Sequence, residues 1–297
     1  MVVRGVFSNR TIPHGGWERL MKIIYFNNKE QIDEDIIQAL RELNHKVIPV
    51  ENLDFKEKAD VFLFRNTIIP SSDLVEFFKK LNELKAFLRD LKCKKVLWFT
   101  DKIIGLGADF IEEIIPFTDK VFANDDTWVR RHDYGILPLH LAAGKRKEGK
   151  YQKKYDVDIA FNGKIHIPNV KWVNGLKTIY QNKFKLFNVQ GQDFADLCVS
   201  AKILVFPWFP YDNFFWTEEI YEAINAGAFV IFPRTYGIDL EEKEQYVGYN
   251  MMIELVDAIN WFLEHENERK LVVKQGKRAV REKFVYRERL RELLEKI

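Results

Sequence analysis

The sequence contains very little cysteine and no long apolar run. Among its 297 residues only Cys93 and Cys198 are cysteines, too few and too far apart for a disulfide framework or a cysteine-based metal site. No apolar run approaches the roughly 18 residues that a membrane-spanning helix needs. Residues 1–20 lack the apolar core of a secretory signal, and we interpret them as an N-terminal extension. We therefore expect a cytoplasmic protein in a reducing compartment.

An excess of charge of either sign is also missing. The 46 basic residues nearly balance the 44 acidic ones, and the resulting net charge of +2 gives no global signal for a polyanionic partner. We accordingly expect no nucleic-acid partner. Hydrophobic residues make up 47% and charged residues 30%, proportions that suit a globular protein with sizeable cores. The heavy use of Lys and Glu favours a heat-adapted source, a thermophile.

The glycine-rich fingerprint of dinucleotide-dependent dehydrogenases, Gly-x-Gly-x-x-Gly, is absent after the strands that could precede it. The first expected strand is followed by Asn27-Asn28-Lys29, and a later one by Asn162-Gly163-Lys164. The glycines of that fingerprint let the backbone approach a pyrophosphate closely. Their absence disfavours a hydride-transfer enzyme.

Strand and helix patterns alternate from Met21 onwards. Apolar strands are expected at 22–26, 46–50, 60–64, 95–100, 120–123 and 135–141, and helical stripes at 33–43, 72–91 and 109–115. Strands that are separated by helices favour right-handed crossovers and a mostly parallel sheet. We therefore predict a first α/β domain over residues 21–143.

A glycine-bearing, basic segment at 144–155 interrupts this alternation. It carries six lysines and arginines and almost no apolar residues, so we interpret it as a linker. Its cations are compatible with peripheral contact with an anionic membrane or polymer. The alternation then resumes and predicts a second domain over 156–283. A charged helix within 284–297 follows, placed to pack back on the first domain.

The most informative segment of the chain runs from 217 to 237. It places Glu222 in a short helix that stops at Ala226-Gly227, and a buried strand then leads to the polar turn 234–237. In a parallel sheet this order brings Glu222 and the turn toward the carboxyl edge of the strands, where ligands bind. A solvated helix face explains the same pattern, because polar and apolar residues fall on opposite sides of the helical wheel.

The order Tyr221-Glu222-Ala223-x-x-Ala226-Gly227-x-x-Val230-Ile231 resembles the nucleotide-sugar site of group 1 glycosyltransferases. Other segments resemble the branch that includes spore-maturation-type proteins, and they occur in that branch's order: 97–101, 136–143, 156–163 and 276–289. The resemblance covers roughly residues 95–297. It implies the GT-B fold, in which two Rossmann-like, doubly wound α/β domains face a cleft. It also implies transfer of a sugar from a nucleotide-diphosphate donor that the second domain holds.

The resemblance assigns Glu222 to the ribose hydroxyls of the donor, and a carboxylate suits that role because it accepts from two neighbouring hydroxyls. Exposed bases near the expected cleft are candidates for the diphosphate, with an ordinary surface role as the alternative. The loop at 206–216 is dense in aromatic residues that either stack on a ring of the ligand or pack against the core. The full set of expected donor-binding residues is Glu222, Gly163, Lys164, Lys171, Arg234, Thr235, Tyr236, Gly237, Asp212 and Asn213.

On the acceptor side, Asp101 follows a predicted strand at the cleft edge, where it could orient the acceptor or act as a base; a turn residue is the alternative. His132 and His140 are weaker candidates for proton transfer. The pair Asp156 and Asp158 begins a strand at the opposite edge from the cleft, so we reject a metal-binding role for it. We expect no metal and no cofactor besides the nucleotide-sugar co-substrate.

Two departures from the family pattern matter. Phe214 stands where group 1 enzymes often carry a second glutamate, which weakens the inference that the anomeric configuration is retained. Glu218 and Glu219 stand where the spore-maturation branch tends to place an arginine. Two acids in the first turn of a helix compete with a phosphate for the same amides, so we expect the pyrophosphate to lie elsewhere, among cations.

The sequence thus predicts a glycosyltransferase, hexosyltransferase-like, retaining and metal-independent. The acceptor is expected to be a carbohydrate, a lipid-linked molecule or a protein. Two alternatives remain at this stage. One is a nucleotide-sugar epimerase with the same fold, and the other is a non-catalytic protein that binds a nucleotide or a sugar.

Overall fold

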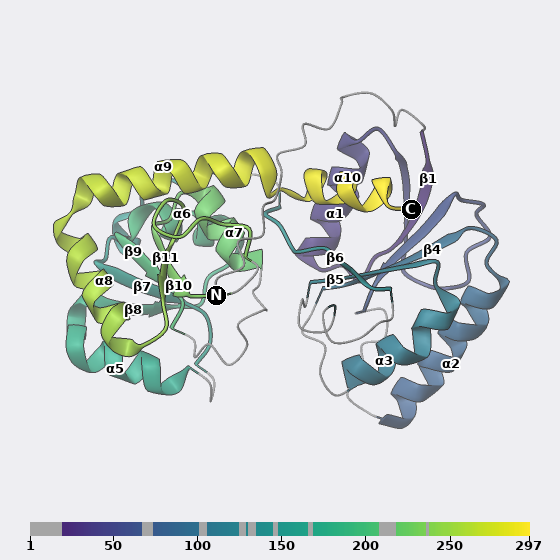
Figure 1. Ribbon diagram of the computed structural model, residues 1–297, viewed down its shortest axis with the longest axis horizontal. Coiled ribbons are helices and arrows are strands. Elements are labelled where there is room, and N and C mark those ends of the chain that lie inside the picture. Colours follow the sequence, from purple (N-terminus) through teal and green to yellow (C-terminus); the bar gives the residue numbers. More distant parts are fainter. Residues whose placement is uncertain are drawn as a thin grey trace, which may run out of the picture.

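The computed structural model describes residues 20–66, 74–100, 106–124, 129, 135–144, 148–165, 169–207, 218–235 and 238–297. The described chain forms two lobes, each built around a parallel β-sheet with helices on both faces (Figure 1). The predicted fold class is confirmed. Within these ranges, no helix combines the length and the apolar character that spanning a bilayer demands.

The N-terminal lobe is built on a six-stranded sheet in the order β2-β1-β3-β4-β5-β6. Every pairing in it is parallel. Its strands are β1 (Lys22–Phe26), β2 (Lys46–Val50), β3 (Val61–Arg65), β4 (Lys94–Phe99), β5 (Lys120–Ala123) and β6 (Leu137–Pro138). The inner residues of the central strands are apolar, as a sheet covered on both faces requires. All five residues of β3, for example, are buried.

Two separate cores sandwich this sheet. One lies under α2 (Leu74–Asp90) and α3 (Leu106–Ile114) and is rich in phenylalanine. The other lies under α1 (Gln31–Glu42) and α10 (Tyr286–Glu295). The last helix of the chain therefore completes the N-terminal lobe, and Figure 1 shows it beside α1. The amphipathic spacing of Leu290, Leu293 and Leu294 places their side chains in this core.

The C-terminal lobe is built on a five-stranded parallel sheet in the order β11-β10-β9-β7-β8. Its strands are β7 (Ile159–Asn162), β8 (Phe184–Phe187), β9 (Ile203–Val205), β10 (Val230–Pro233) and β11 (Val247–Tyr249). One face is covered by α6 (Gly191–Ser200), α7 (Glu218–Ala226) and α9 (Glu266–Lys283). The other face is covered by α5 (Val170–Tyr180) and α8 (Met252–Glu264).

The chain crosses between the lobes twice, and the two crossings run side by side. The amide of Ala143 donates to the carbonyl of Phe284 at 2.9 Å, and the amide of Tyr286 donates to the carbonyl of Ala143 at 3.2 Å. Ala143 and Val285 form a parallel β-bridge. We call this double crossing the hinge. Both covalent connections between the sheets therefore pass one point of the molecule.

Two strands differ from the sequence expectation. A strand over 135–141 was expected, but β6 covers only Leu137–Pro138. Pro138 has no amide hydrogen to donate, and the amide of Leu141 bonds instead to the side chain of Asn124 at 3.0 Å. Strand β11 was not predicted, because three residues with a central Gly248 give no readable alternation.

Candidate functional site

A cavity of about 830 Å³ lies between the two lobes. From the N-terminal lobe it is lined by the start of α1, and from the C-terminal lobe by α7 and by the loops that follow β7 and β8. In each sheet the chain reverses its direction of winding beside the strand that leads into the cavity, at β1 and at β7. Ligands of doubly wound proteins bind at the carboxyl ends of strands at such switch points.

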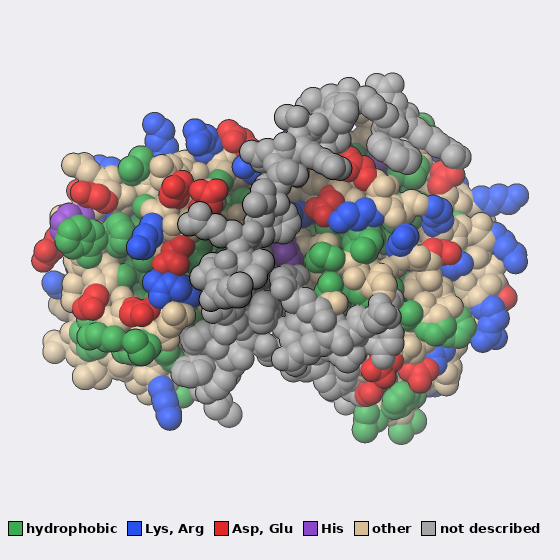
Figure 2. Space-filling model, in the orientation of Figure 1, with side chains coloured by type: hydrophobic (Ala, Val, Ile, Leu, Met, Phe, Trp, Pro, Cys, Tyr) green, Lys and Arg blue, Asp and Glu red, His purple; other side chains and the backbone are tan. Residues whose placement is uncertain are grey.

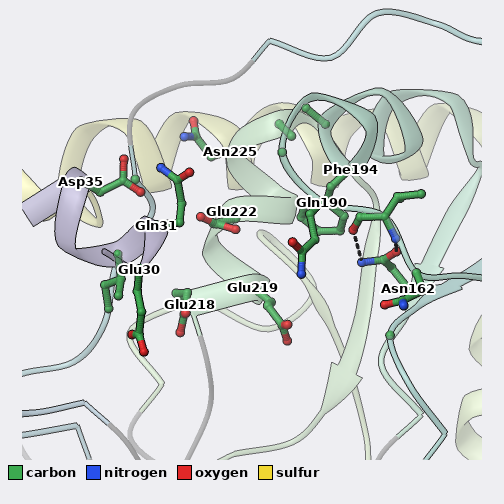
Figure 3. Close-up of a pocket in the computed structure, with 18 of the residues that line it drawn as sticks. Glu30, Gln31, Asp35, Asn162, Gln190, Phe194, Glu218, Glu219, Glu222 and Asn225 are labelled. Atoms are coloured by element: carbon green, nitrogen blue, oxygen red, sulfur yellow. Dashed lines mark hydrogen bonds between the residues drawn. The ribbon is translucent and has the colours of Figure 1, made fainter. Parts of the chain in front are cut away.

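The start of α1 is held rigidly by the buried carboxylate of Asp33. Asp33 Oδ1 accepts hydrogen bonds from the hydroxyl of Tyr25 at 2.6 Å and from Arg65 Nη1 at 3.0 Å. Its Oδ2 accepts from the amides of Asn28 and Glu30 at 3.0 and 3.2 Å. Glu30 also pairs with Arg65 Nη2 at 2.6 Å. This network fixes the backbone that presents Glu30, Gln31 and Asp35 to the cavity (Figure 3).

Helix α7 forms the opposite wall. Glu218, Glu219, Glu222 and Asn225 all line the cavity, and Figure 3 shows Glu222 between Gln31 of α1 and Gln190. The apolar face of the same helix, with Ile220, Ala223 and Ile224, is buried in the core. The helical wheel seen in the sequence is therefore correct, but its polar face points to the cavity between the lobes rather than to open solvent.

The loops after β7 and β8 are bonded to each other at the floor of the cavity. The side chain of Asn162 donates to the carbonyl of Val189 at 3.1 Å and accepts from the amide of Val189 at 2.9 Å. The amide of Gly163 donates to the carbonyl of Phe187 at 2.9 Å. Gly163 has φ of +142°, a conformation that side chains with a Cβ rarely adopt. The asparagine and the glycine thus fix the backbone that leads to Lys164, which also lines the cavity.

The hinge contributes Gly144 and Tyr286 to the lining. A Cβ added at Gly144 would overlap the carboxyl group of Asp35, so a larger residue there would displace the Asp35 side chain on α1. Tyr286 is 3% exposed, and its ring meets that of Trp98 edge-on with centroids 6.0 Å apart. Burial, followed by the charges of Glu218 and Glu222, raises the pKa of Tyr286 well above its ordinary value.

The lining is strongly acidic in the described part of the chain. It includes the carboxylates of Glu30, Asp35, Glu218, Glu219 and Glu222 against the one ammonium group of Lys164. The charge of these groups also acts inside the core. The pKa of the fully buried Cys198 thiol is raised mainly by burial and secondly by the charge of Glu222. Carboxylates accept hydrogen bonds from hydroxyls, so this lining suits a polyhydroxylated ligand.

The structure brings together three of the residues that the sequence assigns to the donor. Glu222, Gly163 and Lys164 line the same cavity. Lys171 lies exposed on α5 and does not line it. Arg234 is also outside the lining, because Glu242 and Glu254 hold its guanidinium in ion pairs of 2.9 and 2.7 Å. Thr235, which follows it, donates its hydroxyl to the carbonyl of Pro233 at 3.0 Å.

The remaining predicted residues lie outside the described part of the chain, and their roles stay predictions. They are the acceptor-side candidates Asp101 and His132 and the donor-side candidates Asp212, Asn213, Tyr236 and Gly237. The weaker candidate His140 is described. Its Nδ1 lies 3.2 Å from Asp239 Oδ2, and Asp239 also pairs with Arg289. This arrangement ties the C-terminal lobe to the N-terminal lobe.

Sequence reasoning missed the contributions of α1, of the loop after β8 and of the hinge. Asp35 sits on the polar side of an amphipathic helix, where the pattern alone indicates a solvated face. Gln190 and Gly191 follow a strand, and that position at a sheet's carboxyl edge was the signal that could have found them. Tyr286 gave no signal, because its place depends on α10 returning to the other lobe.

In the described ranges, no group of three or more His, Cys, Asp or Glu residues is arranged to hold a metal ion.

Residues 149–295 match the model of a family described as "Glycosyl transferase-like". Among solved structures, an alpha-glucosyltransferase in complex with UDP-glucose and DNA containing an abasic site has a TM-score of 0.70 at 9% identity, covering 93% of this chain and 99% of that one. Anabaena HepE in complex with UDP-glucose has a TM-score of 0.65 at 10% identity, covering 93% and 100%. A glycosyltransferase from Rickettsia africae has a TM-score of 0.60 at 12% identity, covering 94% and 98%. Among curated proteins, none matches the chain by sequence.

At these identities the structural likeness shows the fold, and the fold is that of the GT-B glycosyltransferases. The family match places the C-terminal lobe, with the helix that returns from it, among the glycosyl transferase-like domains. The chain therefore has the GT-B fold, and its residues 149–295 are glycosyl transferase-like, as the resemblance implied. The assignment to the spore-maturation branch stays a prediction.

The expectation that nucleic acid is excluded as a partner is wrong. The alpha-glucosyltransferase that shares this fold is seen with DNA that has an abasic site and with a 13-mer DNA containing a HMU base. Net charge reports a sum, whereas binding to phosphates depends on where the cations lie. Figure 2 shows basic and acidic side chains interspersed over both lobes, a distribution that the net charge of +2 does not reveal.

Proposed function

We propose that this chain transfers a sugar from a nucleotide-diphosphate sugar, which binds in the cavity between the lobes. The observation that carries the proposal is the position of Glu222. It lies on the matched glycosyl transferase-like region, and its side chain lines a cavity at the switch points of both sheets. Structures of the same fold hold UDP-glucose, which makes a uridine nucleotide the first donor to test.

In this proposal Glu222 accepts hydrogen bonds from the two ribose hydroxyls of the donor. The diphosphate lies toward Lys164 and the amides of the loops after β7 and β8, away from the acids of α7. Two acids open that helix, Glu218 and Glu219, and they occupy the electrostatic position that a phosphate would otherwise take. Arg234 is excluded from this role in the described conformation, because two carboxylates already neutralise it.

The proposed transfer is retaining and needs no metal ion. Retention rests on the resemblance of the segment around Glu222 to group 1 enzymes, and it is tested by the anomeric configuration of the product in proton NMR. Metal independence predicts that excess EDTA leaves the initial rate unchanged. A rate that falls with EDTA and returns with Mg²⁺ or Mn²⁺ would reject that part of the proposal.

The acceptor meets the donor from the side of α1, where Asp35 and Glu30 face the cavity. Carbohydrate, lipid-linked and protein acceptors remain to be tested. Double-stranded and single-stranded DNA belong in the same panel, since a structure of this fold holds DNA. Closure of the lobes over both substrates would exclude water and so limit hydrolysis of the donor.

The first experiment is a thermal-shift panel of nucleotides and nucleotide sugars. A ligand at about 100 times its Kd stabilises a protein by roughly 2.7 kcal/mol, a shift that is easily measured. We expect a response to UDP and to UDP-hexoses. Incubation with the donor alone then separates transfer from epimerisation, because an epimerase alters the sugar without an acceptor. Neither the family match nor the structures of the same fold favour an epimerase.

A further inference from the structure

The cavity lining includes a polar group that the proposed binding of the nucleotide leaves unused and without a partner among the described residues, the phenol of Tyr286. Tyr286 lines the cavity at the hinge, and only 3% of its surface is exposed. Its hydroxyl oxygen is fully buried and has no hydrogen-bond partner in the described structure. A buried hydroxyl without a partner costs about 1–3 kcal/mol. A ligand hydroxyl in the cavity would remove that cost.

The phenol is held in place by its surroundings. The ring lies against Trp98 at a centroid distance of 6.0 Å and an interplanar angle of 69°. Trp98 is itself fully buried, and its Nε1 donates to the carbonyl of Leu139 at 3.0 Å. The amide of Tyr286 is fixed by Ala143 across the hinge. The hydroxyl is therefore a preorganised group, and a ligand that bonds it has little side-chain entropy to overcome.

The charges that act on the hydroxyl come from both lobes. They are Glu218 and Glu222 of α7, Arg65 of β3 and Asp35 of α1. Three of these four groups are acids that also line the cavity. Such surroundings repel a phosphate, but they suit a neutral hydroxyl, which can donate to a carboxylate and bond the phenol as well. The phenol stays protonated near neutral pH, because burial and these acids raise its pKa.

We propose that the hydroxyl of Tyr286, flanked by Glu218 and Asp35, binds a hydroxyl group on the sugar ring of the donor and so distinguishes a sugar nucleotide from the free nucleotide diphosphate. This inference rests on the proposed function of the cavity. Glu218 and Asp35 belong to opposite lobes, and Tyr286 lies at the hinge between them. In this proposal the lobes rotate slightly about the hinge, and the rotation exposes the hydroxyl to the ligand.

The test compares Tyr286→Phe with the wild-type chain, because this change removes one oxygen atom and leaves the ring in place. Isothermal titration gives the Kd of UDP and of the UDP-hexose that the wild type binds most tightly. We expect the UDP-hexose to bind the variant about 5- to 10-fold more weakly, the effect of one lost hydrogen bond, and UDP to bind within twofold of wild type. The melting temperature should stay equal or rise, since an unpaired buried hydroxyl is removed.

Tyr249→Phe is the matched control. Tyr249 is equally buried and does not line the cavity, and its hydroxyl donates to the carbonyl of Phe206 at 2.6 Å. We expect it to lower the melting temperature and to leave the ratio of the two Kd values unchanged. An unchanged ratio in Tyr286→Phe, or an equal loss for both ligands, overturns the role in sugar recognition while donor binding stands. If the wild type binds no nucleotide at all, both proposals fail together.

Discussion

At the scale of single residues, the site is decided by which polar groups turn toward the cavity and which are already paired. Glu222 and Lys164 line the cavity, whereas Arg234 is held by Glu242 and Glu254 outside it. All three were candidates in the sequence, Glu222 for the ribose and the two bases for the diphosphate. Their different roles in the structure follow from the neighbours that each side chain meets.

The role of Glu222 predicts the behaviour of Glu222→Gln. The amide has one acceptor oxygen instead of two and no negative charge, so its hydrogen bonds to the ribose hydroxyls are weaker and we expect the Kd of UDP to rise about tenfold. The measurement is titration with UDP and with 2′,3′-dideoxy-UDP, which lacks both hydroxyls. In the wild type UDP should bind more tightly than the dideoxy compound, and the ratio of the two Kd values should be smaller in the variant. Glu268→Gln on the exposed part of α9 is the control, and an undiminished advantage in Glu222→Gln would remove this residue from the ribose site.

Two glycines that lie within helices lead to opposite predictions for the same substitution. A Cβ at Gly276 would lie 2.6 Å from the backbone carbonyl of Gln245, whereas at Gly175 the nearest atom is the terminal methyl of Met252 at 3.1 Å. Alanine improves helix propensity by about 1 kcal/mol at either position. We expect Gly276→Ala to destabilise the protein by about 1–3 kcal/mol, because backbone must move. Gly175→Ala should be neutral or stabilising, because only the end of a flexible side chain must move. Urea titration of both variants measures the difference in the free energy of unfolding.

At the scale of elements, the start of α1 depends on a buried ion pair. Asp33 is fully buried and Arg65 is 3% exposed, and together with Tyr25 and Glu30 they join β1, β3 and α1. The sequence indicates helix α1 by its apolar stripe alone. It does not indicate that an acid in the first turn lies inside the molecule, because only the approach of β3 supplies the guanidinium.

Replacing Arg65 therefore tests this element. Arg65→Met keeps the apolar volume but leaves the carboxylate of Asp33 buried without its cation, a loss of about 3–5 kcal/mol. Chemical denaturation measures it as a lower urea midpoint at an unchanged slope. Arg278→Met on an exposed turn of α9 should shift the midpoint little. Equal midpoints for the two variants would show that the network does not stabilise the start of α1.

At the scale of the whole molecule, the two lobes are joined by the hinge and by the interaction of Asp239 with His140 and Arg289, which we call the interlobe clasp. Asp239 follows β10 in the C-terminal lobe, while His140 follows β6 and Arg289 lies on α10 in the N-terminal lobe. Burial opposes the charge of Asp239, but the hydrogen bond with His140 and the charge of Arg289 outweigh it and hold the pKa of Asp239 below its ordinary value.

The interlobe clasp should make the free energy of unfolding depend on pH. Because its folded-state pKa is lowered, Asp239 adds stability that is complete above the unfolded pKa of about 3.9 and is lost as the pH falls through the folded value. We expect the wild type to exceed Asp239→Asn by about 1 kcal/mol at pH 5.5 and to lose that advantage toward pH 3; this magnitude allows for a side chain that is 31% exposed. Unfolding at several pH values measures it, with exposed Asp257→Asn as the control. A difference that is constant with pH would contradict the clasp.

The two parallel sheets could be predicted from the sequence, because strand and helix periodicity are local properties. The sequence also placed Gly163 and Lys164 after a strand, and Glu222 in a helix that leads to the carboxyl edge of the sheet. It could not place Asp35 and Tyr286 in the same cavity, since these residues come from opposite ends of the chain and meet only when α10 packs against α1. It also could not tell Arg234 from Lys164. Which base is neutralised by neighbouring acids and which lies at the cavity depends on distances between separate segments of the chain, and these distances are set by the fold.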